Sequence, residues 1–568
     1  MLHRFKKYNL KTLIIVCLTL VAGFVFGYQV AQESAISKEE VRSAQKVFNL
    51  NFSEEEIEQL LPNVNRTLRG IKELHNYPLD NSTPPALIFR PQNQNNTTGS
   101  LAGSLQIAVE WNIPTNVEMP ANKEDLAFYT VSELASLIKS RKISSEALTK
   151  FFISRLKRYG DDLEAVITLT EDRALAQARR ADDLLKNGTY LGPLHGIPYG
   201  AKDLFAVPGY NTTWGAAPYK DQNRGDELAT VIQKLDDAGA VLVAKLTLGA
   251  LAMGDVWYGG KTRNPWNTTQ GSSGSSAGPA AATSAGLVPF ALGTETLGSI
   301  VSPSTRNGVS GLRPTFGRVS RAGAMALSWS MDKVGPIARN AKDLALVFEA
   351  IRGTDGKDLT LIDRPFNFQE NTDLSKLRIG YIKSYFDRNR ESQKVHDSAV
   401  LEVLKNLGAD LKPVEWVSDM PFPAMQAILS AEAAAAFDEL TRSDRDTMLV
   451  RQNRGAWPNS FRSARFVSAV DYINANRARY ELVDKVNTLM KDFDVIVTPS
   501  YGGSQLITTN LTGHPCVVLK NGYGENGSPT SISFLGNLFD EAKVLAVAYA
   551  YQKATHFDEE HPPEFVFK

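Results

Sequence analysis

The residues best suited to chemistry are one lysine and a cluster of serines in the middle of the chain. Lys202 stands in GPLHGIPYGAKDLFAVPGYNTTWGA (192–216), a mostly small and apolar setting, and four serines lie between glycines in GSSGSSAG (271–278). A serine hydroxyl becomes a good nucleophile only when a neighbouring base takes its proton. A lysine can be that base if burial keeps it neutral near pH 7. These residue types could therefore support nucleophilic catalysis without a metal.

Three common catalytic motifs are matched only in form. Ser276 fits G-x-S-x-G within 274–278, but the polar stretch KTRNPWNTTQGSS precedes it where that motif requires an apolar strand. The S-x-x-K at 136–139 lacks the accompanying S-D-N and K-T-G motifs. The GKT at 260–262 resembles the end of a P-loop, but Asp255 occupies the place of the required first glycine. None of the three indicates the chemistry.

Several separate motifs, in one order along the chain, resemble the amidase signature family of serine hydrolases. Besides the stretch around Lys202 they are SGSSAGPAAATSAG (273–286), LGTETLGSI (292–300), GLRPTFGRVS (311–320), and TNLTGHPCVV and FLGNLFDEAKVLAVAYAYQ near the end. The resemblance runs from about Thr130 to Pro562. It implies an α/β protein with the amidase signature fold, in which helices flank both faces of a mixed β-sheet core. It also implies hydrolysis of a carboxylic amide to an acid and ammonia or an amine.

The resemblance assigns the catalytic roles to a Ser-Ser-Lys triad. The family's lysine falls on Lys202, which would act as general base and then general acid. Its serine with a cis peptide bond falls on Ser275, the expected proton relay. Its nucleophile falls on Ser299, which would carry the acyl group. On this interpretation no serine of the conspicuous stretch 271–278 attacks the substrate.

The resemblance also indicates which residues support the triad. The backbone of Thr296, Leu297 and Gly298 corresponds to the family's oxyanion hole, where N–H groups converge on the developing negative charge. Gly274 is the residue type that best tolerates an unusual backbone before the relay serine. We expect Ser276 to bond the loop backbone or to support the lysine and the relay serine.

The acidic turn departs from the family pattern. Many members read DTGGSIR, whereas this chain reads ETLGSIV at 295–301. Val301 replaces an arginine, so we expect Glu295 to lack a charge partner and the oxyanion loop to be tied less firmly. Leu297 replaces a glycine and restricts the loop's conformations. The change leaves open a catalytically altered, amidase-fold binding protein. The other alternative is a glutaminase-type protein that resembles the A subunit of an amidotransferase.

Composition limits the partners. Lys plus Arg and Asp plus Glu both number 62, so the formal net charge is zero, which gives no support for a nucleic-acid partner. The two cysteines and seven histidines form no motif with metal-ligand spacing. We therefore expect no metal and no cofactor. The expected partner is a small-molecule amide substrate, and a homodimer is a further possibility.

The N-terminus carries a strong compositional signal. Basic residues at 4, 6, 7 and 11 precede TLIIVCLTLVAGFVFGYQV (12–30), which contains no charged residue. This pattern predicts a signal peptide or an N-terminal membrane anchor over residues 1–31. We therefore expect membrane contact through this segment and an exported protein, either membrane-anchored or periplasmic (extracytoplasmic). Such a location argues against the glutaminase-type alternative, whose role belongs to the cytoplasm.

The remaining chain is expected to contain two further regions. Residues 32–104 predict a helical N-terminal region ending in a polar loop, and residues 125–562 the amidase signature domain. Thr130 is a good N-cap for two helices broken near residues 142–144. Short β-rich runs, VLVAKLT (241–247), VIVTPS (495–500) and CVVLKNG (516–522), alternate with helical stretches. The Gly/Ser-rich middle, 254–311, is expected to form loops over the sheet.

Overall fold

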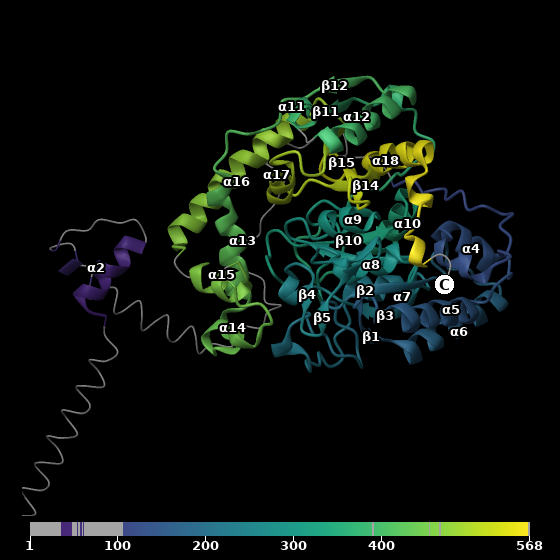
Figure 1. The fold of residues 1–568 in the computed structure, drawn as a ribbon, viewed down its shortest axis with the longest axis horizontal. Coiled ribbons are helices and arrows are strands. Elements are labelled where there is room, and N and C mark those ends of the chain that lie inside the picture. The colour runs from purple at the N-terminus through teal and green to yellow at the C-terminus, as the bar shows by residue number, and fades with distance from the viewer. Residues whose placement is uncertain are drawn as a thin grey trace, which may run out of the picture. The chain divides into compact units, whose positions relative to one another are not determined.

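The computed structural model describes residues 36–47, 54, 57, 58, 61, 106–388, 391–453, 455–464 and 467–565. The chain divides into two units, residues 1–80 with 466–468 and residues 81–465 with 469–568 (Figure 1). In the first unit, α2 (Lys38–Val47) is held by ion pairs from Arg42 to Glu54 (2.6 Å) and from Lys38 to Glu58 (2.9 Å).

The predicted signal peptide or anchor lies outside the described residues, as does most of the region 32–104. Among the helices that the structure describes, none is long and apolar enough to cross a membrane.

The second unit is built on one mixed sheet of eleven strands (Figure 1). The strand order is β1-β3-β2-β8-β10-β9-β14-β15-β13-β11-β12. β2 runs parallel to β3 and β8, whereas β10 is antiparallel to β8 and β9. The strands are β1 (Val166–Leu169), β2 (Pro198–Lys202), β3 (Val241–Leu246), β8 (Phe290–Glu295), β9 (Ser310–Arg313), β10 (Lys333–Ala338), β11 (Ile379–Tyr381), β12 (Leu411–Pro413), β13 (Val495–Pro499), β14 (Cys516–Tyr523) and β15 (Pro529–Gly536).

Helices pack around this sheet, and two short hairpins lie between β3 and α8. The helices are α4 (Val131–Lys139), α5 (Ser145–Tyr159), α6 (Glu171–Lys186), α7 (Thr230–Asp237), α8 (Ala277–Ser284), α9 (Val301–Asn307), α10 (Ala341–Ile351), α11 (Lys383–Arg388), α12 (Glu391–Asn406), α13 (Phe422–Ala436), α14 (Asp438–Arg442), α15 (Trp457–Ala464), α16 (Ala469–Met490), α17 (Gln505–Thr512) and α18 (Glu541–Thr555). The hairpins are β4 (Val256–Trp257) with β5 (Gly260–Lys261), and β6 (Arg263–Asn264) with β7 (Asn267–Gly271).

The central strands separate two hydrophobic cores. Phe290 and Leu292 of β8 belong to the core that α4, α7, α10 and α18 also build, whereas Ala291 between them belongs to a core with α6 and α8. Successive side chains of a strand point to opposite faces, so both faces of β8 are buried. This arrangement confirms the predicted α/β fold with helices on both faces of a mixed sheet.

Several predicted elements are present where the sequence placed them. Thr130 caps α4 in a reciprocal capping box with Glu133, and Ser144 caps α5, so the break near residues 142–144 is confirmed. The expectation that 254–311 forms loops is wrong in part. β8, α8 and α9 all lie within it. The apolar runs AAATSAG and VPFALGT belong largely to α8 and β8, and their residues are mostly buried.

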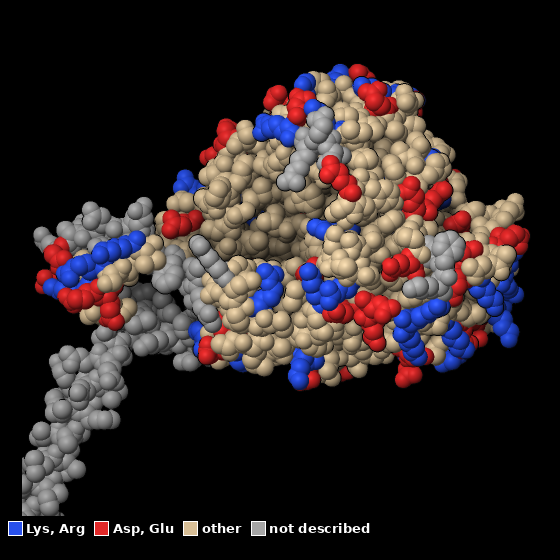
Figure 2. Space-filling model, in the orientation of Figure 1, with Lys and Arg blue, Asp and Glu red and all other residues tan. Residues whose placement is uncertain are grey.

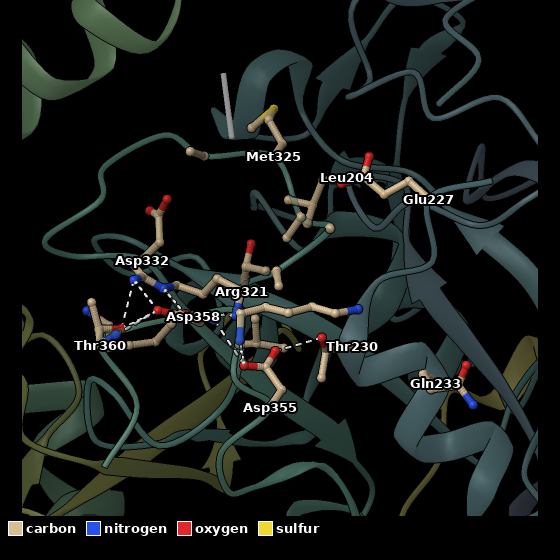
Figure 3. Close-up of a pocket in the computed structure, with 18 of the residues that line it drawn as sticks. Leu204, Glu227, Thr230, Gln233, Arg321, Met325, Asp332, Asp355, Asp358 and Thr360 are labelled. Atoms are coloured by element: carbon tan, nitrogen blue, oxygen red, sulfur yellow. Dashed lines mark hydrogen bonds and ion pairs between the residues drawn. The ribbon is translucent and has the colours of Figure 1, made fainter. Parts of the chain in front are cut away.

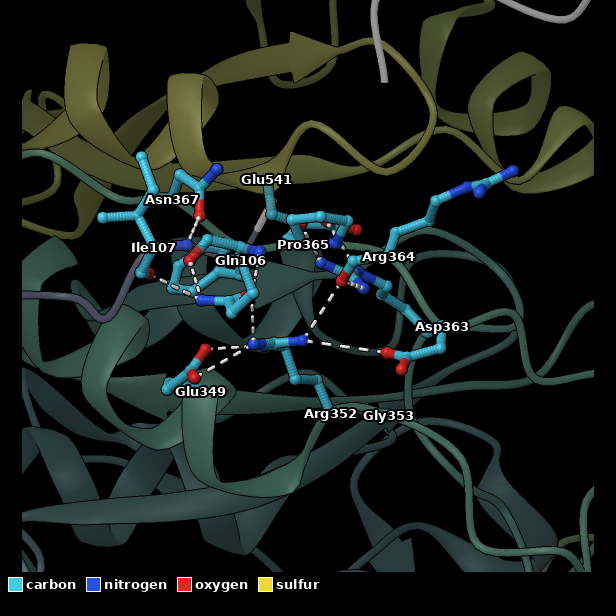
Figure 4. A network of polar contacts seen from close by, with 12 residues as sticks. Gln106, Ile107, Glu349, Arg352, Gly353, Asp363, Arg364, Pro365, Asn367 and Glu541 are labelled. Carbon is cyan, nitrogen blue, oxygen red and sulfur yellow. Dashed lines mark hydrogen bonds and ion pairs between the residues drawn. The ribbon is translucent and has the colours of Figure 1, made fainter. Parts of the chain in front are cut away.

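The C-terminal end of α10 is fastened to two distant segments by one arginine. Arg352 contacts Glu349 (Nε to Oε2, 2.6 Å), the Gln106 side-chain oxygen (2.9 Å) and the Arg364 carbonyl oxygen (3.1 Å) (Figure 4). Gln106 in turn accepts a hydrogen bond from the Phe366 N–H at 2.8 Å. The network joins residues 106–107 and 363–367 to the core helix.

Candidate active site

Lys202 is the last residue of β2, between two parallel neighbours in the middle of the sheet. Its side chain is fully buried. Burial penalises the ammonium form, and the nearby carboxylates of Asp332 and Glu295 only partly offset that penalty. The pKa of Lys202 is therefore lowered to about 7, so a large fraction of the lysine is neutral at physiological pH.

Three hydroxyl groups surround the Lys202 ammonium. Its Nζ donates to Ser275 Oγ (2.8 Å), Ser276 Oγ (3.1 Å) and Thr294 Oγ1 (2.8 Å). Ser275 and Ser276 directly precede α8, and Thr294 lies near the end of β8, the strand beside β2. The site is thus assembled where two parallel strands end against the start of a helix.

The turn before Ser275 has an unusual backbone. The peptide bond between Gly274 and Ser275 is cis. A Cβ on Gly274 would stand 1.9 Å from the carbonyl oxygen of Gly254. Only glycine fits at this position, because the segment before the β4–β5 hairpin presses directly against the turn.

Ser299 lies close to this turn, two residues before α9. The Ser276 N–H donates to the Ser299 carbonyl oxygen at 3.2 Å. Ser299 is 9% exposed, whereas Ser275 is 1% exposed. The structure therefore brings together the lysine and both serines that the resemblance singled out, with Ser299 nearest to solvent.

The predicted oxyanion loop lies between Glu295 and Ser299. Within the described part of the chain, the backbone N–H groups of Thr296, Leu297 and Gly298 donate to no protein acceptor. Gly298 has a φ of +92°, a conformation that favours glycine. These N–H groups are thus available to a ligand oxygen.

The expectation that Glu295 lacks a charge partner is wrong. Its carboxylate pairs with Arg313 of β9 (2.8 Å) and accepts from Asn510 (2.8 Å) and from the N–H groups of Ile300 (2.8 Å) and Val301 (2.9 Å). Burial disfavours ionisation, but Arg313 and these hydrogen bonds outweigh it and hold the pKa of Glu295 at about 2. A residue distant in sequence supplies the charge that the family's arginine would bring.

The loop has a second anchor in Asp332. Its carboxylate accepts from Thr296 Oγ1 (2.6 Å) and from the N–H groups of Leu327 (2.8 Å) and Ser328 (2.9 Å). Burial raises the pKa of Asp332, and the three hydrogen bonds oppose that rise. Carboxylates therefore hold both ends of the predicted oxyanion loop, and that of Glu295 is fully buried whereas Asp332 is partly buried.

A cavity of about 1120 Å³ borders the lysine side of the site. Thr294 and Thr296 line this cavity, together with apolar residues such as Met325 and Leu327. Figure 3 shows Arg321 bound to Asp358 and Thr360 in its wall (Nη2 to Thr360 Oγ1, 2.9 Å).

On the face drawn in Figure 2, acidic and basic side chains are interspersed over the outer surface. A hollow on that face is lined mainly by uncharged residues.

Sequence reasoning missed four residues of this site: Thr294, Asp332, Arg313 and Asn510. Thr294 stands inside a quoted motif, LGTETLGSI, and could have been noticed as a hydroxyl one residue before the acidic turn. Arg313 also stands inside a motif, GLRPTFGRVS, but only strand pairing places it beside Glu295. Asp332 follows LSWSM, which carries no local signal for a role in the loop.

Comparisons with known proteins identify the family. A family model described as "Amidase" matches residues 147–505. This chain belongs to the amidase family. Within this family, the A subunit of the glutamyl-tRNA(Gln) amidotransferase of Thioalkalivibrio sulfidiphilus is 32% identical over 491 residues, which cover 77% of this chain and 99% of the relative. The same protein of Pseudomonas syringae pv. tomato is 34% identical over 485 residues and covers 77% and 99%.

Solved structures of amidase-family proteins share the fold. The peptide amidase of Stenotrophomonas maltophilia has a TM-score of 0.67 and 26% identity, and the match covers 76% of this chain and 98% of that protein. An amidase family protein of Bacillus anthracis has a TM-score of 0.69 and 25% identity, and the match covers 78% and 93%. These matches confirm the predicted amidase signature fold.

The comparisons contradict the predicted export. The curated relatives are matched over 98–99% of their length and are named as parts of a glutamyl-tRNA(Gln) amidotransferase, names that describe no exported or membrane-bound protein. The expectations of a signal peptide, a membrane anchor and an extracytoplasmic location are therefore wrong. They rested on basic residues followed by an apolar run, a pattern of local composition that is not specific for a segment that enters a membrane.

Proposed function

We propose that this chain hydrolyses a carboxylic amide, with Ser299 as nucleophile, Ser275 as proton relay and Lys202 as general base. The observation that carries the proposal is the buried Lys202 Nζ, 2.8 Å from Ser275 Oγ and with its pKa lowered to about 7. A lysine in this state can accept a proton and return it within one catalytic cycle.

The reaction divides into acylation and deacylation. Ser299 Oγ attacks the amide carbon and passes its proton to Ser275, whose own proton moves to Lys202. The N–H groups of the 296–298 loop receive the oxyanion, and such donors are each worth about 2.7–4 kcal/mol. The C–N bond then breaks, and the leaving nitrogen takes a proton from Ser275, which Lys202 replenishes. Water repeats the sequence on acyl-Ser299 and releases the acid.

The relatives support the glutaminase-type alternative better than a free-standing amidase. Three of them, 31–32% identical and matched nearly end to end, are named as the A subunit of the amidotransferase. In an equivalent role, this chain would release ammonia from the carboxamide of glutamine and supply it to a partner protein. The third alternative, an altered binding protein, rested on a weakly tied loop, and the four hydrogen bonds on Glu295 argue against it.

A fluorophosphonate probe tests the nucleophile independently of the substrate. We expect one adduct, at Ser299, that is absent from Ser299→Ala and slow to form in Lys202→Ala. Ser284→Ala is the matched control, because Ser284 is a buried serine that bonds the Asn307 carbonyl oxygen (2.7 Å) outside the site. Rapid labelling of Ser299→Ala, or full activity of Lys202→Ala, would rule out the mechanism.

Ammonia release distinguishes the two enzyme alternatives. The purified chain is assayed with L-glutamine and with a peptide amide, chosen because one structural relative is named a peptide amidase. Hydrolysis of glutamine that depends on Ser299 supports the glutaminase-type role. Turnover of the peptide amide alone favours the free-standing amidase.

A further inference from the structure

The hydrogen bonds around Ser276 permit only one proton arrangement. Ser276 Oγ lies 3.1 Å from the Thr294 carbonyl oxygen, which can only accept, and 3.1 Å from the Thr294 N–H, which can only donate. The Ser276 hydroxyl therefore donates its hydrogen to the Thr294 carbonyl oxygen, and one lone pair of its oxygen accepts from the Thr294 N–H. The remaining lone pair faces Lys202 at 3.1 Å. Lys202 must donate to Ser276 and cannot accept from it.

This restriction matters for the neutral lysine, which has two N–H groups and one lone pair. One N–H is committed to Ser276. The other can point to Ser275 or to Thr294 Oγ1, both at 2.8 Å. A fourth contact, to the Thr294 carbonyl oxygen, is 3.5 Å long and too weak to compete. Lys202 can act as a base only if its second N–H goes to Thr294, because the lone pair then faces Ser275.

We propose that Thr294 is a positioning residue that directs the lone pair of neutral Lys202 toward Ser275. The inference rests on the proposed function and extends it to a residue whose hydroxyl bonds the base Lys202. Thr294 also lines the cavity of about 1120 Å³, whose space can hold water to accept its hydroxyl hydrogen. Its oxygen is then left to accept from the lysine.

Thr294 has a second effect on the protonated lysine. The ammonium has three N–H groups, and Ser275, Ser276 and Thr294 supply one acceptor for each. The charged groups that face Lys202 are Asp332 and Glu295, which both favour the ammonium and are unchanged by substitution of Thr294. Loss of the Thr294 hydroxyl should therefore lower the pKa of Lys202 while it also misdirects the lone pair.

The test measures the rate of fluorophosphonate labelling of Ser299 against pH in the full chain. For Thr294→Val, we expect the plateau rate to fall about 10- to 100-fold, in line with a lost hydrogen bond to a charged group. The acid limb of the profile, where the labelling rate rises with pH as Lys202 loses its proton, should also move to lower pH. Thr294→Ser should keep both the plateau rate and the position of the acid limb close to those of the wild type, because serine retains the hydroxyl and lacks only the methyl group. Should the valine variant fail to fold, Thr294→Ala is measured in the same way.

Thr283→Val is the matched control, since the hydroxyl of this fully buried residue bonds the Pro279 carbonyl oxygen (2.8 Å) within α8, outside the site. A wild-type profile for Thr294→Val would overturn the inference. So would a rate loss that leaves the acid limb in place and is not rescued by serine, since that result indicates a purely structural role. If Ser299→Ala or Lys202→Ala also labels like the wild type, the proposed function itself fails. If the Thr294 variants label like the wild type but Ser299→Ala and Lys202→Ala do not, only this inference is refuted.

Discussion

The buried pair of Glu295 and Arg313 should dominate the stability of the oxyanion loop. Both side chains are fully buried, and the pair replaces the arginine that the family places two residues after the nucleophile. In Arg313→Met the carboxylate of Glu295 loses its charge partner. Breaking one side of such a buried pair costs about 3–5 kcal/mol, because the remaining charge is uncompensated.

The lowered pKa of Glu295 gives a similar free energy for the pair. Its folded value of about 2 lies below the ordinary value of 4.5, so it contributes about 3 kcal/mol to folding at neutral pH. Because the folded pKa is the lower one, this contribution is complete above pH 4.5 and is lost as pH falls from 4.5 toward 2. The wild type should therefore lose stability over that window, and Glu295→Gln/Arg313→Met should lose less.

Thermal unfolding at pH 7 and near pH 3 tests this reasoning. For a chain of this size, about 1 kcal/mol corresponds to roughly 1 °C in Tm, so Arg313→Met should melt about 3–5 °C lower at pH 7. The double variant Glu295→Gln/Arg313→Met should recover part of the loss, since it leaves no unpaired charge. If Arg313→Met melts like the wild type, or the double variant melts no higher than the single one, the pair does not stabilise the loop.

Three further predictions follow from the site. Val301→Arg restores the family's residue, but Val301 is 1% exposed, so we expect a lower Tm and no gain in labelling rate. The labelling rate should rise with pH through about 7 as Lys202 becomes neutral, and Asp332→Asn should move this limb to lower pH, because it removes a charge that favours the ammonium. Gly274→Ala should nearly abolish labelling and lower Tm, because its Cβ would stand 1.9 Å from the Gly254 carbonyl oxygen.

Each of these predictions has a control or a contrary outcome. A higher Tm in Val301→Arg would mean that the loop is not already tied by the pair described above. If the acid limb of the pH–rate profile does not move in Asp332→Asn, Asp332 is not a determinant of the Lys202 pKa. Gly455→Ala is the control for Gly274→Ala, since a Cβ there meets no atom within 4 Å and should be tolerated.

Some elements were predictable because their sequence signals are local. The capping box of Thr130 and Glu133 and the valine-rich run of β3 each lie within a few residues. β8 was harder to recognise, because FALGTE combines a glycine with two polar residues and is typical of a loop by composition. Its hydrogen-bonded neighbours β2 and β10 lie about 90 residues before and 40 after it, and they make it a central strand.

The order of motifs along the chain was enough by itself to determine the family, the fold class and the three candidate catalytic residues. Tertiary structure alone decided how Lys202 is surrounded and how the oxyanion loop is held. Arg313, Asn510 and Asp332 reach that loop from separate strands, helices and turns, and Thr294 reaches the lysine across a strand pair. Burial and hydrogen bonding arise only when distant segments pack, so neither the pKa of Lys202 nor the replacement for the missing arginine has a local signal in the sequence.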